Sequence, residues 1–107
     1  MEKKVIVSEK SPAAIGPYSQ AIEYNGIVYT SGVIGVNPAT GEVGETIEEQ
    51  TTQVFENLKG LLADAGSSLD KAIKTTVFIK NMDDFAKVNE SMLLILQVHF
   101  QHVPVWK

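Results

Sequence analysis

The chain has 107 residues, a length that fits one domain large enough to bury a hydrophobic core. Its net charge of −4, with scattered lysines, argues against nucleic acid as a main partner, and the absence of cysteine excludes disulfides and thiolate catalysis. The first residues hold too few apolar side chains for a signal peptide, and no stretch approaches the roughly 20 apolar residues of a membrane span, so we expect a cytoplasmic protein.

The first predicted elements are a short strand over residues 4–8 and a rigid loop. Pro12 and Pro17 in this loop each fix φ at about −65°, which restricts the backbone. Gly16 precedes the second proline and permits conformations that other residues resist. The loop therefore delivers the next segment in a fixed position.

A β-hairpin follows the loop. Residues 18–24 and 27–32 read as two strands, and Asn-Gly at 25–26 reads as the turn between them. An Asn-Gly pair between two such runs is the strongest short hairpin signal. The hairpin would join the Tyr18 hydroxyl and the backbone of Ser31–Gly32 in one rigid unit.

The first predicted helix comes after a connection over residues 33–45 that contains a proline-glycine turn signal. Thr46 and Glu49 have the spacing of a capping box, and Gly66 is placed to end the helix in a left-handed conformation. The apolar residues recur with a period close to 3.6 at Ile47, Val54, Leu58, Leu61, Leu62 and Ala65. This periodicity predicts a helix that lies on a sheet.

A second strand-and-helix unit is predicted from residue 72 onward. Residues 72–80 are β-branched and aromatic, and one face of this strand would carry Ile73, Thr75, Val77 and Ile79. Asn81 or Asp83 can cap a second helix, one side of which would carry Phe85, Val88 and Met92. These elements predict an α+β two-layer sandwich, with a mixed β-sheet and both helices on one face.

Five stretches of the chain, in this order, resemble the signature of the RidA family, also called the YjgF family. They are residues 11–21, 29–32, 48–51, 74–78 and 84–90. The resemblance implies a chorismate-mutase-like sandwich and homotrimers with a site in each subunit interface. It also implies a hydrolase of reactive imines and enamines, such as 2-iminobutanoate and 2-iminopropanoate, which become 2-keto acids and ammonia. No cofactor is implied.

The same resemblance assigns candidate catalytic residues. Tyr18 would line the cleft, Ser31 would offer a hydroxyl, and Asn89 would supply an amide across the interface. Each residue also has a simpler interpretation. Tyr18 could be a half-buried strand aromatic, Ser31 a strand-end hydroxyl bonded to backbone, and Asn89 a solvated helix residue.

Candidate substrate-binding residues follow Ser31 directly and are Gly32, Val33 and Ile34. Val33 stands where the family usually has glutamine, and Gly35 stands where it usually has proline. Both departures lie beside the expected site, so the substrate specificity does not follow from the resemblance.

Residues 91–107 depart from the resemblance, so we divide the chain into a RidA-like domain over 1–90 and an aberrant tail. The family continues with a helix end, a Phe-Pro-Ala-Arg motif and two final strands, none of which the tail contains. Suitable synonymous codons for the tail, read in another frame, encode Tyr-Ala-Thr-Tyr-Phe-Thr-Ser-Pro-Phe-Pro-Ala-Arg-Thr-Cys-Val-Glu. We therefore interpret the tail as the product of a net one-base loss near Glu90.

The interpretation has a chemical consequence at Val103, which occupies the place of the arginine expected to grip the substrate carboxylate. Catalysis should then be disabled, and a non-catalytic ligand-binding or regulatory trimer is the alternative function. His99 and His102 are three residues apart and could face one way on a helix, but without a third ligand they do not predict a metal site.

Overall fold

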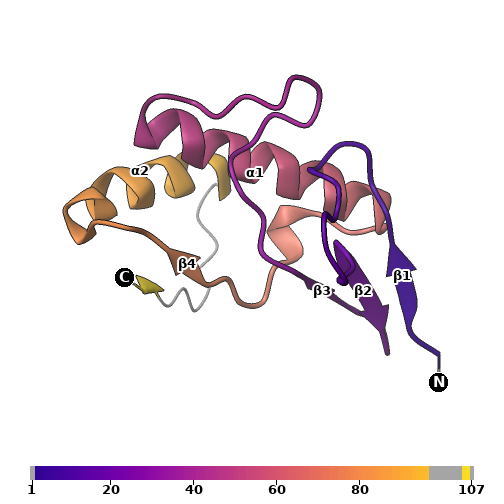
Figure 1. Cartoon of the computed structure of the whole chain (residues 1–107). Helices are drawn as coiled ribbons and strands as arrows, with labels where there is room; N and C mark the ends of the chain where they lie inside the picture. The colour runs from indigo at the N-terminus through magenta and orange to yellow at the C-terminus, as the bar shows by residue number, and fades with distance from the viewer. Residues whose placement is uncertain (1, 97–104, 107) are drawn as a thin grey trace.

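The computed structural model describes residues 2–96 and 105–106 of the chain. The strands are β1 (Lys4–Ile6), β2 (Ala21–Tyr24), β3 (Ile27–Thr30), β4 (Val77–Phe78) and β5 (Val105–Trp106). The helices are α1 (Ile47–Asp64) and α2 (Phe85–Leu96), with two short 3-10 helices, η1 (Leu69–Lys71) and η2 (Met82–Asp84). Figure 1 shows α1 and α2 side by side on one side of the strands. The predicted α+β class with both helices on one face is confirmed.

The first three strands form an antiparallel sheet in the order β1-β2-β3, and β4 pairs with β5 in parallel. Antiparallel and parallel strand pairs are therefore both present among the described residues, and they lie in two separate sheets. The β2–β3 hairpin turns at Asn25 and Gly26, whose φ angles are 53° and 80°. These left-handed values are those that a two-residue hairpin turn requires, so the predicted turn is confirmed.

The hairpin strands are shorter than the sequence predicts. The chain does not enter β2 at residue 18, because the Tyr18 N–H donates to Gly16 O at 2.8 Å and bends the backbone around Pro17. β2 begins only at Ala21, and β3 ends at Thr30. Tyr18 and Ser31 consequently lie just outside the ladder, at the end of the sheet nearest the loop.

Helix α1 begins and ends as predicted. The Glu49 N–H donates to Thr46 Oγ1, and Gly66 follows the helix with a φ of 79°. The Glu49 carboxylate accepts from the N–H of Glu45 rather than from that of Thr46, which places the return bond one residue early.

The hydrophobic core has two clusters that share α1. The first joins Ile6 and Ala21 of the sheet to Leu61, and the second joins Phe55 to Val88 and Met92 of α2. Phe55 was not among the predicted core positions, although it is buried. Since α1 contributes to both clusters, it holds the antiparallel sheet and α2 on different sides of the same helix.

The predicted strand over residues 72–80 is wrong for most of its length. The strand found there is Val77–Phe78, with an isolated bridge at Lys74, and its described partner β5 is equally short. Ile73 is 75% exposed rather than buried on a sheet face. At the start of the segment the physical reason is that residue 72 caps η1, because the Ala72 N–H donates to Leu69 O and so is not free to pair with a strand.

The predicted start of the second helix is confirmed at Asn81, whose Oδ1 accepts from the N–H of Asp83. This cap opens η2, which continues directly into α2. Val88 and Met92 are buried as predicted, whereas Phe85 remains 40% exposed. Helix α2 crosses the expected domain boundary at residue 90 without a break. Within the described part of the chain, no helix is long and apolar enough to cross a membrane.

Candidate functional site

The loop before the hairpin is organised by the buried side chain of Gln20. Its Nε2 donates to Ser8 O at 3.0 Å, Ser11 O at 3.3 Å and Pro12 O at 2.8 Å. Its Oε1 accepts from the Ser8 N–H at 2.8 Å, so one amide satisfies four backbone groups. Because an unpaired buried backbone group is costly, these bonds fix the loop against the start of β2.

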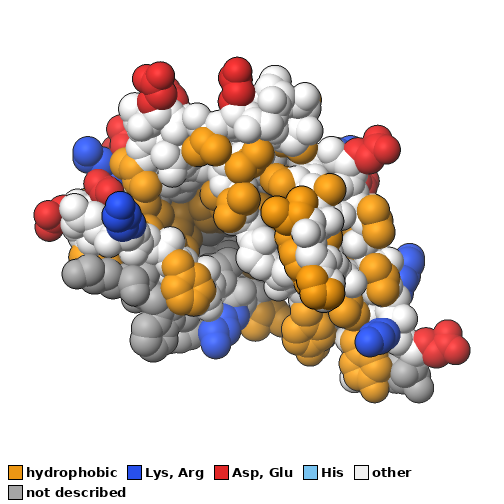
Figure 2. All heavy atoms as spheres, in the orientation of Figure 1, with side chains coloured by type: hydrophobic (Ala, Val, Ile, Leu, Met, Phe, Trp, Pro, Cys, Tyr) orange, Lys and Arg blue, Asp and Glu red, His pale blue; other side chains and the backbone are white. Residues whose placement is uncertain are grey.

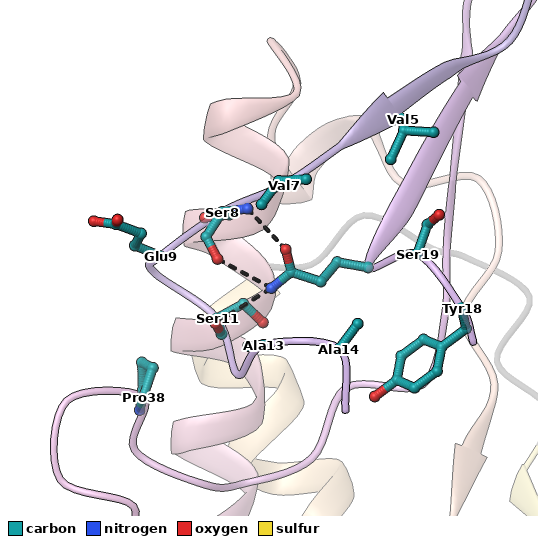
Figure 3. A pocket seen from close by; sticks show the side chains of 11 residues that line it. Val5, Val7, Ser8, Glu9, Ser11, Ala13, Ala14, Tyr18, Ser19 and Pro38 are labelled. Atoms are coloured by element: carbon teal, nitrogen blue, oxygen red, sulfur yellow. Dashed lines mark hydrogen bonds between the residues drawn. The ribbon is translucent and has the colours of Figure 1, made fainter. Parts of the chain in front are cut away.

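Two pockets flank this loop and share its residues as a wall. The first, which we call the loop pocket, has a volume of about 500 Å³ and is drawn in Figure 3. The second, which we call the Ser31 pocket, has a volume of about 350 Å³. The Tyr18 side chain lines both pockets and is half exposed, and in Figure 3 it points toward the loop segment that carries Ala13 and Ala14.

The Ser31 pocket brings together most of the residues that the sequence singled out. Its lining includes Tyr18, Ser31, Gly32, Val33 and Ile34. Asn89 is not part of this lining, because it lies exposed on α2. Within one copy of the chain, the structure therefore assembles five of the six candidate residues and leaves Asn89 apart.

Ser31 is held by the backbone of the neighbouring strand. Its N–H donates to Gln20 O at 3.0 Å, and its Oγ donates to the same oxygen at 3.1 Å. The simpler interpretation of Ser31 as a strand-end hydroxyl bonded to backbone thus describes its hydrogen bonds. The residue nevertheless lines the pocket, so the two interpretations are compatible.

Another part of the Ser31 pocket lining, at Ile34 and Val36, is hydrogen-bonded to α1 through Asn57. This side chain is 1% exposed, and its Nδ2 donates to Ile34 O at 3.0 Å and Val36 O at 2.8 Å. Gln53 Nε2 donates to Asn57 Oδ1 at 2.8 Å and completes the network. Between these carbonyls, a Cβ added at Gly35 would lie 2.7 Å from Gln50 O, so only glycine fits there without a shift.

Sequence reasoning missed both Gln20 and Asn57. Asn57 stands one helical turn before Leu61, on a face that is otherwise buried, and a polar residue in that place was an available signal. Gln20 follows a proline-containing loop whose carbonyls need donors, but nothing local indicates which donor reaches them.

The loop is also tied to the C-terminal end of α1. Ser8 Oγ donates to Asp64 Oδ2 at 2.5 Å, and Lys10 Nζ lies 3.1 Å from Asp64 Oδ1. The hydrogen bond from Ser8, followed by that from Lys10, holds the pKa of the Asp64 carboxyl below its ordinary value of 3.8. A Cβ added at Gly60 would lie 2.5 Å from Lys10 Cβ, so a glycine in the helix lets the loop approach this closely.

The lining of the two pockets carries little charge. Among the described residues that line them, Glu9 is charged and none is basic. All nine basic residues of the chain are lysines, so no arginine is present anywhere in the sequence to grip a carboxylate. No group of three or more metal-ligating side chains occurs among the described residues, and His99 and His102 lie outside them.

The sequence profile of the Endoribonuclease L-PSP family matches residues 8–107. The chain belongs to this family. It is 46% identical over 86 residues to the 2-iminobutanoate/2-iminopropanoate deaminase of Salmonella typhimurium, covering 80% of this chain and 67% of that protein. It is 45% identical over 91 residues to Reactive Intermediate Deaminase A, chloroplastic, of Arabidopsis thaliana, covering 84% of this chain and 49% of that protein.

Solved structures of relatives have the same fold. RidA from the Antarctic bacterium Psychrobacter sp. superposes with a TM-score of 0.91 at 37% identity, covering 95% of this chain and 83% of that chain. TdcF of E. coli with bound serine gives a TM-score of 0.88 at 36% identity, covering 95% and 83%. The RidA resemblance is confirmed, and the relatives that carry deaminase names support imine deaminase chemistry for the family.

Proposed function

We propose that the Ser31 pocket is the site of a RidA-type imine deaminase that acts on 2-iminobutanoate or 2-iminopropanoate. The observation that carries this proposal is that five of the six candidate residues line one pocket of about 350 Å³. That volume is large enough to admit a substrate with a four-carbon skeleton. Water adds to the electrophilic C=N carbon, and the resulting carbinolamine collapses to the 2-keto acid with ammonia as the leaving group.

The described residues supply the polar and apolar parts of such a site. Tyr18 and Ser31 would hold the water and the imine nitrogen by hydrogen bonds, which is the positioning that accelerates an addition to an electrophile that is already activated. Gly32 would offer backbone contacts, and the aliphatic Val33 and Ile34 would enclose the alkyl chain. Asn89, which lies exposed on α2, would reach the site from a second copy of the chain.

Assembly into a homotrimer is part of this proposal. The register places Val5, Ile22 and Tyr29 in one row across the sheet, and Val5 and Tyr29 are more than half exposed. Figure 2 shows hydrophobic side chains gathered over the part of the molecule where β1–β3 lie. A second and third copy would cover this surface. We expect sedimentation to show a trimer at micromolar concentration, and a monomer there would contradict the proposal.

The chain as written lacks one part of the site. A buried carboxylate without a cationic partner is costly to hold, and no described lining residue is basic. Val103, which stands where the family carries its arginine, lies outside the described residues. We attribute this loss to the one-base shift near Glu90, and sequencing of the gene across codons 88–92 tests that attribution directly.

A non-catalytic ligand-binding or regulatory trimer is the second candidate, and the uncharged lining of the Ser31 pocket favours it. An assay separates the two candidates. A threonine dehydratase generates 2-iminobutanoate in place, and 2-oxobutanoate formation is followed with a chain whose frame is restored after residue 90. A Ser31→Ala variant of the restored chain serves as the site control. Turnover that depends on Ser31 supports the enzyme, whereas ligand binding without turnover supports the second candidate.

A further inference from the structure

Gln20 joins the two walls that meet at the Ser31 pocket. Its side chain holds the loop through Ser8 and Pro12, while its backbone carbonyl holds both the N–H and the hydroxyl of Ser31. Ser8 lies 12 residues before Gln20 and Ser31 lies 11 residues after it. A single residue thus sets the position of the loop relative to Ser31, which lines the pocket.

The same bonds decide what Ser31 offers to a ligand. A hydroxyl has one proton and two lone pairs, and the proton of Ser31 is donated to Gln20 O. That carbonyl already accepts from the Ser31 N–H as well, so both of its lone pairs have a donor. With its proton committed in this way, Ser31 Oγ can serve a ligand in the pocket only as an acceptor.

We propose that Gln20 is a positioning residue of the Ser31 pocket, and that through Ser31 it makes the pocket select ligands that carry an N–H donor. In the proposed reaction, which supplies the identity of the ligand, this donor is the N–H of the imine. The donor preference itself depends on how the Ser31 hydroxyl is held by the Gln20 carbonyl, and not on any charge of the ligand. It is therefore measurable in the 107-residue chain, with ligands that carry no charge and need no cationic anchor.

A matched pair of neutral probes tests the acceptor role. 2-Oxobutanamide carries N–H donors, and methyl 2-oxobutanoate is similar in size but carries none. We expect the wild-type chain to bind the amide about tenfold more tightly, as one hydrogen bond implies. Ser31→Ala should abolish that difference, so that the ratio of the two affinities falls to about one. Equal affinities of the wild-type chain for the two probes would overturn the acceptor role.

Substitutions at Gln20 test the positioning role. Gln20→Met keeps the length of the side chain but removes the hydrogen bonds that fix residue 20 against the loop. The backbone carbonyl of residue 20, which orients the Ser31 hydroxyl, is then no longer held in place, so the preference for the amide should fall to about onefold. Thr51→Val is the matched control, because it removes another buried side-chain hydrogen bond, from Thr51 Oγ1 to Ile47 O, and Thr51 lines neither pocket. An unchanged preference in Gln20→Met, or an equal loss in Thr51→Val, would overturn the proposal.

Gln20→Glu adds a readout that a merely structural role would not give. As a carboxylate the new side chain faces the carbonyls of Ser8, Ser11 and Pro12 and repels them, whereas as a carboxylic acid it can donate to one of them. The preference for the amide should therefore be absent at pH 8 and return toward pH 5, while that of the wild-type chain stays constant. A preference in Gln20→Glu that does not change with pH would count against positioning by the side chain. If the chain restored after residue 90 shows no imine turnover while the probe preference is intact, only the proposed function is contradicted.

Discussion

The segment from Ser8 to Gly66 and the segment from Ser67 to Leu96 are held in place by different means. The first is fixed by buried amides, since Gln20 and Asn57 each bind backbone groups on distant loops. The second contains the short-range side-chain hydrogen bonds from Ser68 to Asp70 and from the Asp83 N–H to Asn81. The buried Thr75 Oγ1 there has no hydrogen-bond partner among the described residues. Hydrogen bonds from buried amides fix the loops of the first segment at defined distances from the sheet and α1. In the second segment, apolar packing on Phe55 fixes α2, but it does not order β4, the strand before α2, beyond two residues.

The largest expected effect is on imine turnover, and it comes from the arginine that the family uses to bind the substrate carboxylate. We expect no measurable 2-iminobutanoate hydrolysis by the 107-residue chain and turnover by the chain restored after residue 90. A lost bidentate contact to the carboxylate costs several kcal/mol, on the order of a thousandfold in rate or more. Val103→Arg alone should not restore turnover, because the rest of the tail still differs in sequence from the family segment expected to position the arginine. Substantial turnover by the uncorrected chain would refute both the role of the anchor and the frame interpretation.

A pair of substitutions distinguishes the two kinds of support. Asn57→Ala leaves the carbonyls of Ile34 and Val36 without a donor, and Met92→Ala leaves a cavity beside Phe55. Each should lower the free energy of unfolding by about 2–4 kcal/mol, measured by denaturant titration. Only Asn57→Ala should also weaken the binding of 2-oxobutanamide, because it releases a wall of the Ser31 pocket. Equal losses of binding in both variants would show that the two segments are not supported independently.

Two glycines beside the Ser31 pocket form a smaller and cleaner test. Gly35→Ala places a Cβ 2.7 Å from the backbone oxygen of Gln50, and the overpacking should cost about 1–3 kcal/mol of stability. A Cβ added at Gly32 meets no atom within 4 Å, so Gly32→Ala should leave the melting temperature unchanged. A melting temperature for Gly35→Ala equal to that of the wild-type chain would mean that the loop moves away from α1 without cost.

The smallest expected effect is the pH dependence of the stability that comes from the contacts of Asp64 with Ser8 and Lys10. The pKa of Asp64 is lower in the folded chain than its ordinary value of 3.8, so its contribution to stability is present above that value. It is lost as the pH falls through the lower, folded-state pKa. Asp64→Asn should therefore melt slightly below the wild-type chain at pH 7, and the difference should vanish in strong acid. Glu56→Gln, which removes an exposed carboxylate from the same helix, is the matched control.

Local signals predicted the local structure well. Asn25-Gly26 identified the hairpin, and Thr46, Gly66 and Asn81 identified helix ends, because each of these features depends on residues close in sequence. The motifs also predicted that Tyr18 and Ser31 would lie near one another. Residues 72–80 were predicted poorly, because the length of a strand depends on its partner strands as well as on its own β-propensity. The bonds of Asn57 to Ile34 and Val36 span more than 20 residues, so no local pattern reveals them.

The contact between Gly60 and Lys10 has a consequence for protein engineering. A glycine inside a helix normally invites replacement by alanine, which raises helix stability by about 1 kcal/mol. At position 60 the new methyl group would meet Lys10 Cβ at 2.5 Å and push away the loop that forms the wall of both pockets. A routine thermostabilisation screen would thus rank this position highly and damage the proposed binding site. Thermostabilising changes in α1 belong instead at exposed positions such as Thr52.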